Sequence, residues 1–532
     1  MQYNIFKVSK KNLLIRKLLE EEYEISEKII ESGGYKLSLY YKKKDNSQIS
    51  WQNVLNKFNV NISIDKDSLK GILIADNGTD MYAITYGMGS ALVQKYCDSE
   101  FPMDIAKRVN VSKVKRKASK ILNGSTNSLV RTLTNSDYIV LDRGESVVNL
   151  ELVPDENENL GKSVGIGKSL RFNIDKDIEL FDQIVTLINN INSRMEKRPI
   201  PLILLVKDEE LLKEIWNYIN DEYIKQIENV DFCLEDMNIL GCSIFFDDDY
   251  KIELAFKNYS EEVPFLNTNY VRKFIKDKNI DINEVYKYLK IRYITDDGLH
   301  FVKRFVDSIT FDFSFEGEKY VLYDGNVYYY NKDYLDNIKD GMKNINFEKY
   351  NKKYDFSSDW YKQFLEDNNY VDVKEKNKKG KETIYREQAL NIKLSEICNY
   401  DNMDRNIIKI CKDEDYKIEI ADIAKEGEEL FAVKIGTPRD FCYAIDQSIQ
   451  TVDAFLSKTK DEEGLIEKYQ DVKKIGLWLY VTGNNKFFDE KNDIDIFSFD
   501  SIMFLNKLTE WANRVVSANK EPVIRINYYK QN

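Results

Sequence analysis

The segment from Tyr416 to Gln450, YKIEIADIAKEGEELFAVKIGTPRDFCYAIDQSIQ, constrains the fold more than any other part of the sequence. Two runs rich in apolar residues flank a charged turn that contains glycine, which is typical of an antiparallel hairpin. A loop and an amphipathic stretch follow, and they predict a helix. Asp422 then lies near the end of the first strand, and Lys434 lies near the end of the second.

The residues before this hairpin add further acids. The stretch IYREQALNIKLSEI, residues 384–397, predicts a helix that carries Glu387 and Gln388, and Asp401 or Asp404 follows at a turn. This order of helix, turn, strand, strand and helix resembles the PD-(D/E)xK nuclease core. In such a core two or three carboxylates hold Mg²⁺, which takes oxygen ligands, and a lysine orients water or neutralises charge.

Glu387, Asp422 and Lys434 are therefore the candidate catalytic residues, and Asp422 is the candidate ligand for Mg²⁺. The core also needs an acid two residues before the lysine, because side chains two apart share one face of a strand. Ala432 stands there, and the same alternation places Glu419 on the opposite face from Asp422. The alternatives are a metal-dependent nuclease, a site rebuilt for phosphate binding, or a plain hairpin with its charged turn in solvent.

The segment VSKVKRKASK, residues 111–120, is the best candidate for contact with nucleic-acid phosphates. It contains five basic residues and no acid. Basic side chains that contact phosphates release the counterions of the nucleic acid, although a solvated helix face accounts for the same pattern. The candidate binding residues are Lys113, Lys115, Arg116, Lys117 and Lys120.

The single histidine, His300, excludes several kinds of site. Zinc sites built on paired histidines cannot form, and no GxSxG motif accompanies the histidine for a serine triad. GKSVGIGKS, residues 161–169, lacks the glycine spacing of a phosphate-binding loop and leads into a predicted strand, so no nucleotide cofactor is expected. The net charge of −12 argues against a uniformly basic surface but is compatible with a local basic patch.

The chain of 532 residues predicts a multidomain protein of mixed α/β (α+β) class. We predict an N-terminal α/β domain over residues 1–160, a mainly helical domain over 161–305 and a nuclease-like α/β domain over 306–532. The last should contain a central mixed sheet that includes the apolar run IGLWLYV. The first residues lack the apolar core of a signal peptide, and the apolar runs are too short to cross a bilayer. We therefore expect a cytoplasmic protein without membrane contact.

Several blocks spread over the chain carry a resemblance: MYAITYGMGSALV, FPMDIAKRVN, LYDGNVYYYNKDYLDNI, YREQA, IEIADI and ELFAVKIG. Through them the chain resembles a sporadically distributed family of bacterial proteins found in restriction and phage-defence neighbourhoods. In that family the last block usually ends in an apolar residue, His, Val and Lys, where this chain has Ala432, Val433 and Lys434. The resemblance implies an anti-phage defence protein that binds DNA or RNA. The positions carried over from the family pattern are Glu387, Gln388, Asp422 and Lys434.

Two further functions stay open. The chain could be a non-catalytic recognition or scaffold component that acts with a partner defence protein. It could also be an interaction protein without a nucleic-acid function, which the acidic charge balance favours. Salt-dependent binding of DNA or RNA separates the first two functions from the third, and Mg²⁺-dependent cleavage separates the nuclease from the recognition component.

Overall fold

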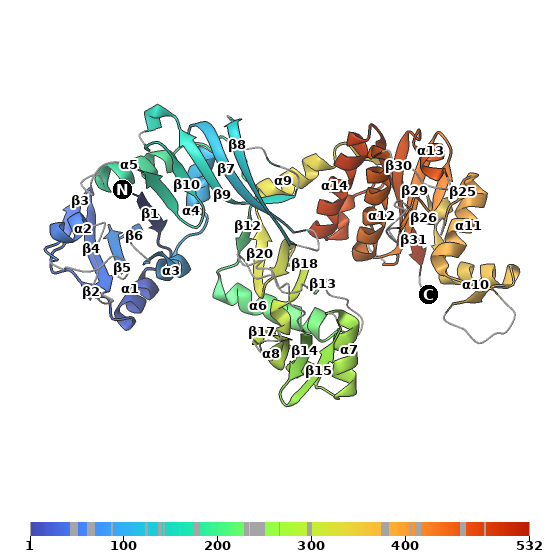
Figure 1. The fold of residues 1–532 in the computed structure, drawn as a ribbon, viewed down its shortest axis with the longest axis horizontal. Coiled ribbons are helices and arrows are strands. Elements are labelled where there is room, and N and C mark those ends of the chain that lie inside the picture. The colour runs from blue at the N-terminus through green and yellow to red at the C-terminus, as the bar shows by residue number, and fades with distance from the viewer. Residues whose placement is uncertain are drawn as a thin grey trace. The chain divides into compact units, whose positions relative to one another are not determined.

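In the computed structural model the chain forms two compact units (Figure 1). The first unit comprises residues 1–121, 126–204 and 330–334, and the second comprises 122–125, 205–329 and 335–532. The boundaries predicted at residues 160 and 305 lie within these units. The structure describes residues 2–42, 52–60, 70–86, 89–122, 126–136, 141, 144–158, 160–173, 181–227, 233–234, 251–264, 266–294, 300–373, 382–404, 407–409, 417–457, 464–483 and 486–530.

The first unit is built on a large sheet with the strand order β2-β4-β5-β6-β1-β11-β10-β9-β7-β8, and β3 pairs with β4. Helix α1 packs on it through Leu14 and Leu18, which contact a buried cluster around Ile72 and Ile74. The strands are β1 (Gln2–Lys7), β2 (Glu24–Ile25), β3 (Ile30–Ser32), β4 (Tyr35–Lys42), β5 (Lys70–Asp76), β6 (Met81–Tyr86), β7 (Val111–Leu122), β8 (Thr126–Ser136), β9 (Glu145–Pro154), β10 (Val164–Ile166) and β11 (Leu170–Asn173). The helices are α1 (Lys11–Glu20), α2 (Gln52–Lys57), α3 (Ser90–Val93), α4 (Phe101–Arg108) and α5 (Phe181–Asn192).

The glycine-containing segment 161–169 and the basic segment 111–120 both contribute strands to this sheet. Residues 161–169 lead through β10 into β11, and these two strands pair antiparallel. A strand therefore follows the last glycine, as the sequence predicts, where a phosphate-binding loop needs a helix. The basic segment 111–120 lies in strand β7 rather than on a helix.

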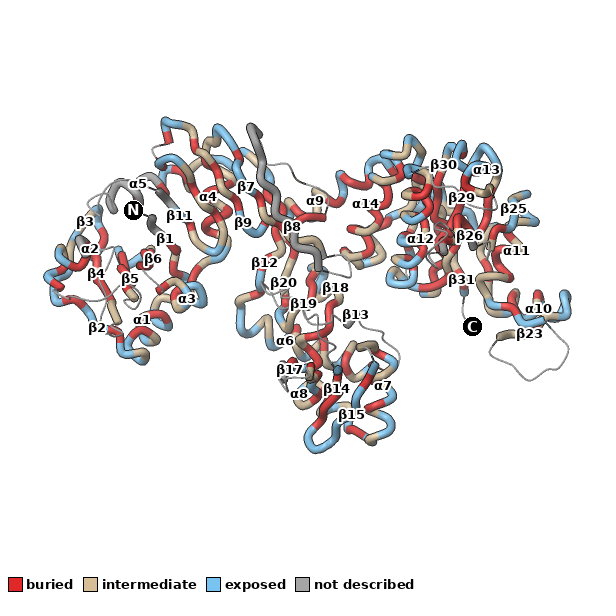
Figure 2. The backbone as a smooth tube through the Cα atoms, viewed as in Figure 1, coloured by how far each residue is buried: buried red, intermediate tan, exposed pale blue. Residues whose placement is uncertain are grey.

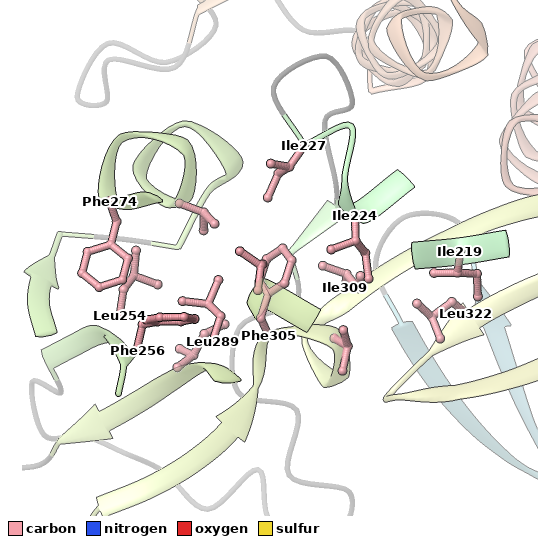
Figure 3. Close-up of a cluster of buried hydrophobic side chains, with 14 of the residues drawn as sticks. Ile219, Ile224, Ile227, Leu254, Phe256, Phe274, Leu289, Phe305, Ile309 and Leu322 are labelled. Atoms are coloured by element: carbon pink, nitrogen blue, oxygen red, sulfur yellow. The ribbon is translucent and has the colours of Figure 1, made fainter. Parts of the chain in front are cut away.

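The first part of the second unit combines helices with two antiparallel sheets. One sheet has the order β15-β14-β16-β17, and the other includes β20-β19-β18-β13. A shared core around Leu254, Phe274, Leu289 and Phe305 fills the space between them and the helices (Figure 3). The elements are α6 (Glu209–Ile219), β13 (Cys233–Leu234), β14 (Lys251–Phe256), β15 (Tyr259–Val263), α7 (Thr268–Asp277), α8 (Ile282–Tyr288), β16 (Leu289–Ile294), β17 (His300–Arg304), β18 (Ile309–Phe315), β19 (Glu318–Tyr323) and β20 (Asn326–Tyr330).

The C-terminal part of the second unit contains a mixed sheet with the order β21-β31-β30-β29-β28-β25. Strands β29 (Glu429–Gly436), β30 (Lys474–Val481) and β31 (Glu521–Lys530) run parallel, whereas β28 (Ile423–Lys425) and β25 (Asp401–Asn402) pair antiparallel. The remaining elements are α9 (Lys332–Gly341), β21 (Asn346–Phe347), β22 (Phe356–Ser357), α10 (Ser358–Asp367), β23 (Val371–Asp372), β24 (Thr383–Ile384), α11 (Arg386–Cys398), β26 (Ile407–Lys409), β27 (Lys417–Glu419), α12 (Pro438–Leu456), α13 (Leu465–Tyr469) and α14 (Ile502–Ser517).

Helices cover both faces of this mixed sheet (Figure 1). On one face α11 packs through Leu390 and Leu394 against Phe431 and Trp478, and on the other face lie α12 and α14. The run IGLWLYV forms β30 between two parallel neighbours, and it is buried throughout (Figure 2). A strand covered on two faces needs continuous apolar residues rather than alternation.

The predicted mixed α/β class is confirmed, with helices and several sheets in one chain. Among the described residues, no helix combines the length and the apolar character that a bilayer crossing requires.

Candidate functional site

The site lies where β28 and β29 separate. Strand β30 pairs with β29 along residues 429–436, but β28 pairs only with residues 429–431. The last part of β29 therefore has an edge that no β28 residue covers. Asp422 lies at a bend just before β28, and its backbone N–H donates to the carbonyl of Phe431 over 3.0 Å.

Two carboxylates bind the N–H groups along this open edge. Asp422 Oδ2 accepts a hydrogen bond from the backbone N–H of Val433 over 2.7 Å. Glu387 of α11 accepts one from Ile435 N–H over 3.2 Å, and its second oxygen lies 2.9 Å from Lys434 Nζ. The structure thus brings Glu387, Asp422 and Lys434 together. The two acids bind the N–H groups of Val433 and Ile435 on β29, and Lys434 lies between these two residues in the sequence. Lys434 pairs with Glu387 rather than with Asp422.

Two further acids join Asp422. Asp404 follows β25, Glu419 ends β27, and carboxylate oxygens of all three acids lie within 4.8 Å of one another. The expectation that Glu419 points away from Asp422 is wrong. Alternation of faces holds only along a continuous strand, and the chain leaves β27 at residue 420 and bends at Asp422 before β28 begins. Glu419 also accepts a 3.1 Å hydrogen bond from Gln447 Nε2 of α12.

Burial and neighbouring charge strongly affect Asp422, which is only 7% exposed. Burial raises the pKa of its carboxyl group from 3.8 to about 8. The N–H of Val433 opposes this shift by stabilising the carboxylate, and the negative charges of Glu419, Asp404 and Glu387 add to it. A nearby cation would therefore stabilise the ionised form of Asp422.

Asn391 contacts Asp422 from α11. Its side chain is fully buried on α11, and Nδ2 donates to Asp422 Oδ1 over 3.2 Å. Within the described chain, no hydrogen-bond donor reaches Asn391 Oδ1. A buried amide oxygen without a partner is costly unless a water molecule or a cation satisfies it.

These donors fit a hard divalent cation. Asp404, Glu419 and Asp422 offer carboxylate oxygens and Asn391 offers an amide oxygen, the ligand types that Mg²⁺ and Mn²⁺ prefer. Ala432 stands where the nuclease pattern requires an acid, and it is buried and offers no oxygen. Glu419 instead places a carboxylate beside Asp422 from β27. The sequence did not predict this placement, because the bend that turns Glu419 toward Asp422 has no signature in the local pattern.

Lys434 also contacts an aromatic ring at the protein surface. Its ammonium group lies 5.2 Å from the ring centre of Tyr443 on α12. Lys434 itself is half-buried, with 22% of its side chain exposed, whereas Tyr443 is 65% exposed. The lysine is therefore accessible from solvent beside the acids.

The five basic candidates lie on β7, in the first unit, and their environments differ. Lys113, Lys115 and Arg116 are exposed, and the last two lie 3.8 and 3.7 Å from Glu151. Lys120 is half-buried. Lys117 has no exposed surface and pairs with the equally buried Glu145, so its ammonium group cannot reach a phosphate in this structure. Strict alternation of faces after the buried Val114 would expose Lys117. Register shifts in the pairing of β7 with β9 interrupt this alternation, so Lys117 is buried instead.

Comparisons with known proteins identify the family. Searches of the curated proteins and of the solved structures returned no match. The model of one family matches residues 5–497, which include Glu387, Asp404, Glu419, Asp422 and Lys434. The match covers most of the chain, and the protein therefore belongs to the family of unknown function DUF6119.

Proposed function

We propose that the C-terminal part of the chain hydrolyses phosphodiester bonds in nucleic acid with a divalent cation, Mg²⁺ or Mn²⁺. The observation that carries this proposal is the convergence of Asp404, Glu419 and Asp422 at the open edge of β29, where Asp422 binds the N–H of Val433, the residue before Lys434. A compact group of acids next to a basic side chain combines what binds a hard cation with what binds a phosphate.

The residues take different roles in this proposal. Asp404, Glu419 and Asp422 hold the cation, together with Asn391 Oδ1, and Gln447 keeps the carboxylate of Glu419 in place. A bound divalent cation lowers the pKa of water and neutralises charge on a phosphate. Lys434 binds a non-bridging phosphate oxygen as a point charge.

The order of the elements supports a nuclease-like core. Helix α11, the antiparallel strands β28 and β29, helix α12 and the parallel strand β30 follow one another as in the PD-(D/E)xK arrangement. The resemblance to proteins from restriction and phage-defence neighbourhoods supports a role in anti-phage defence in the cytoplasm. DNA and RNA are both candidate substrates, and a partner defence protein is a candidate for control of the activity.

The test is cleavage of labelled single-stranded DNA, duplex DNA and RNA with Mg²⁺, with Mn²⁺ and with EDTA. We expect metal-dependent cleavage that Asp422→Ala and Glu419→Gln each reduce by at least 100-fold. Glu428→Gln is the matched control, because Glu428 lies on the turn of the same hairpin and pairs with the neighbouring Lys425 at 2.7 Å. Cleavage that persists in the Asp422 and Glu419 variants contradicts the proposed site.

A non-catalytic recognition function is the second candidate, and Ala432 favours it. The usual acid of the motif is absent, and the lysine that should face the substrate is already paired with Glu387. In this case the protein binds DNA or RNA for a partner effector and cuts neither. Binding of nucleic acid that depends on Lys434, without cleavage under any metal condition, identifies this function.

A further inference from the structure

Glu387 occupies an anion-binding position at the open edge of β29. One of its oxygens accepts from the backbone N–H of Ile435 over 3.2 Å, and the other lies 2.9 Å from Lys434 Nζ. An N–H group and an ammonium group that face the same anion are the usual donors for a phosphate in proteins. Two oxygens of a phosphate group in the place of the Glu387 carboxylate would therefore accept hydrogen bonds from both donors, Ile435 N–H and Lys434 Nζ.

This anion-binding position lies two residues along β29 from the N–H group that binds Asp422 of the acidic cluster. Val433 N–H binds Asp422, and Ile435 N–H, two residues further on, binds Glu387. N–H groups two residues apart point to the same side of a strand and are separated by about 6.6–6.8 Å. The two anion positions thus lie next to each other along one edge, as neighbouring parts of one extended ligand require.

The pair that occupies the position is open to exchange. The side chain of Glu387 is 35% exposed and that of Lys434 is 22% exposed. Both side chains keep contact with solvent, so water screens part of their attraction and a phosphate can approach Lys434 Nζ from outside. By contrast, Asp422, which binds the neighbouring N–H of Val433, is buried, so a phosphate from solvent cannot displace it.

We propose that Lys434 Nζ and Ile435 N–H form a phosphate subsite for nucleic acid, which Glu387 fills as an internal anion until a substrate phosphate displaces it. This inference rests on the proposed function, because it assigns a substrate phosphate to the same edge. It differs from a catalytic role for Glu387, because removal of its charge should then improve substrate binding rather than impair it. Tyr443, exposed beside Lys434, offers a ring face to the base or sugar next to this phosphate.

The experiment measures binding of a fluorescein-labelled single-stranded oligonucleotide, as DNA and as RNA, by anisotropy in EDTA over a series of salt concentrations. EDTA removes the contribution of any cation, so the result does not depend on catalysis. For Glu387→Gln we expect at least threefold tighter binding at low salt. The slope of log K against log salt should also steepen by about 0.7, the value for one additional phosphate contact on a single strand. Glu387→Ala should behave in the same way.

The controls separate a specific subsite from a change in net charge. Glu396→Gln removes the same charge from the same helix, where Glu396 pairs with Lys393 at 3.0 Å, and it should leave the affinity and the slope unchanged. Glu387→Gln combined with Lys434→Met should lose the whole gain. Circular dichroism confirms that each variant is folded.

The outcomes distinguish this inference from the proposed function. A gain in affinity without any metal-dependent cleavage by the native protein supports the phosphate subsite and contradicts the nuclease. Weaker or unchanged binding by Glu387→Gln, an equal gain in Glu396→Gln, or no measurable binding by any variant contradicts the subsite, whether or not the native protein cleaves nucleic acid.

Discussion

The carboxylate of Asp422 accepts a hydrogen bond of 2.7 Å from the backbone N–H of Val433, in a buried place that it shares with other acids. This bond fixes Asp422 at the point where β28 leaves β29. It also stabilises one negative charge against the burial that disfavours it. The position of the whole acidic cluster follows from this contact, because Glu419 precedes Asp422 by three residues and Met403, next to Asp404, donates its N–H to the carbonyl of Asp422 over 2.8 Å.

The first prediction concerns the pH dependence of stability without metal. The pKa of Asp422 is about 8 in the folded chain and near its ordinary value of 3.8 when unfolded, so between these values unfolding releases a proton. The contribution of Asp422 to the free energy of unfolding therefore falls as pH rises from about 4 to about 8, by at most about 1.4 kcal/mol per pH unit. We expect Asp422→Asn to gain stability over the native protein from pH 5 to pH 8 in EDTA. Thermal unfolding at four pH values measures it, and a difference that does not change with pH contradicts the prediction.

The second prediction concerns metal binding. A cation that binds only the folded state stabilises it by about 2.7 kcal/mol at a concentration 100 times its dissociation constant. Mn²⁺ should therefore raise the melting temperature of the native protein, and Asp404→Asn or Glu419→Gln should remove most of this shift. Differential scanning fluorimetry with a Mn²⁺ series measures it. Glu428→Gln, which changes an acid outside the cluster, should keep the full shift.

The third prediction concerns Arg525 on β31, whose side chain is only 16% exposed. Its guanidinium group binds both oxygens of Glu348 over 2.8 and 3.0 Å, approaches Glu429 at 3.3 Å and lies over the rings of Phe431 and Trp478. Arg525→Met removes the cation that faces Glu348 and Glu429, although Tyr400 Oη still donates a hydrogen bond to Glu429. Glu348 is 35% exposed and water screens part of its charge, so we expect a loss of about 3 kcal/mol, the lower end for breaking a buried network. Urea denaturation followed by tryptophan fluorescence measures the loss.

Arg514 offers the matched control for this substitution. It joins α14 to α12 by pairing with Asp453 at 2.8 Å, but its side chain is 43% exposed. Arg514→Met should therefore cost less than about 1 kcal/mol. Equal losses in the two variants contradict a special role for the buried arginine.

The fourth prediction separates stability from nucleic-acid binding on β7. Lys117→Met leaves Glu145 buried without its cation and should destabilise the first unit by about 3–5 kcal/mol.

Lys115 and Arg116 are exposed, so Lys115→Glu with Arg116→Glu should leave the protein folded and weaken binding of DNA or RNA, with a flatter salt dependence. Lys162→Glu with Lys168→Glu changes the net charge equally on exposed residues of the same unit. Equal loss of binding in the two double variants indicates that β7 is ordinary solvated surface.

The sequence by itself determined much of the order of elements and several members of the site, although the predicted first strand of the hairpin is divided into β27 and β28, with Asp422 at the bend between them. Continuous apolar residues identify β30 as a strand covered on both faces, because only such a strand has no solvent-facing side. The glycine-containing turn identifies the pair β28 and β29, and Gly427 adopts a positive φ of 69° there. The order of elements also predicted that Asp422, Lys434 and Glu387 lie near one another, and the structure brings them to one edge of β29.

Only the tertiary structure decided which acids meet and which lysines stay accessible. Glu419 turns toward Asp422 because the chain bends between β27 and β28, and Asp404 arrives from a separate strand. Lys117 is buried because irregular pairing with β9 shifts the faces of β7. Periodicity along a chain predicts faces only while a strand is regular and continuous. Bends, irregular pairing and contacts between distant residues depend on how the whole sheet packs, and no local pattern encodes them.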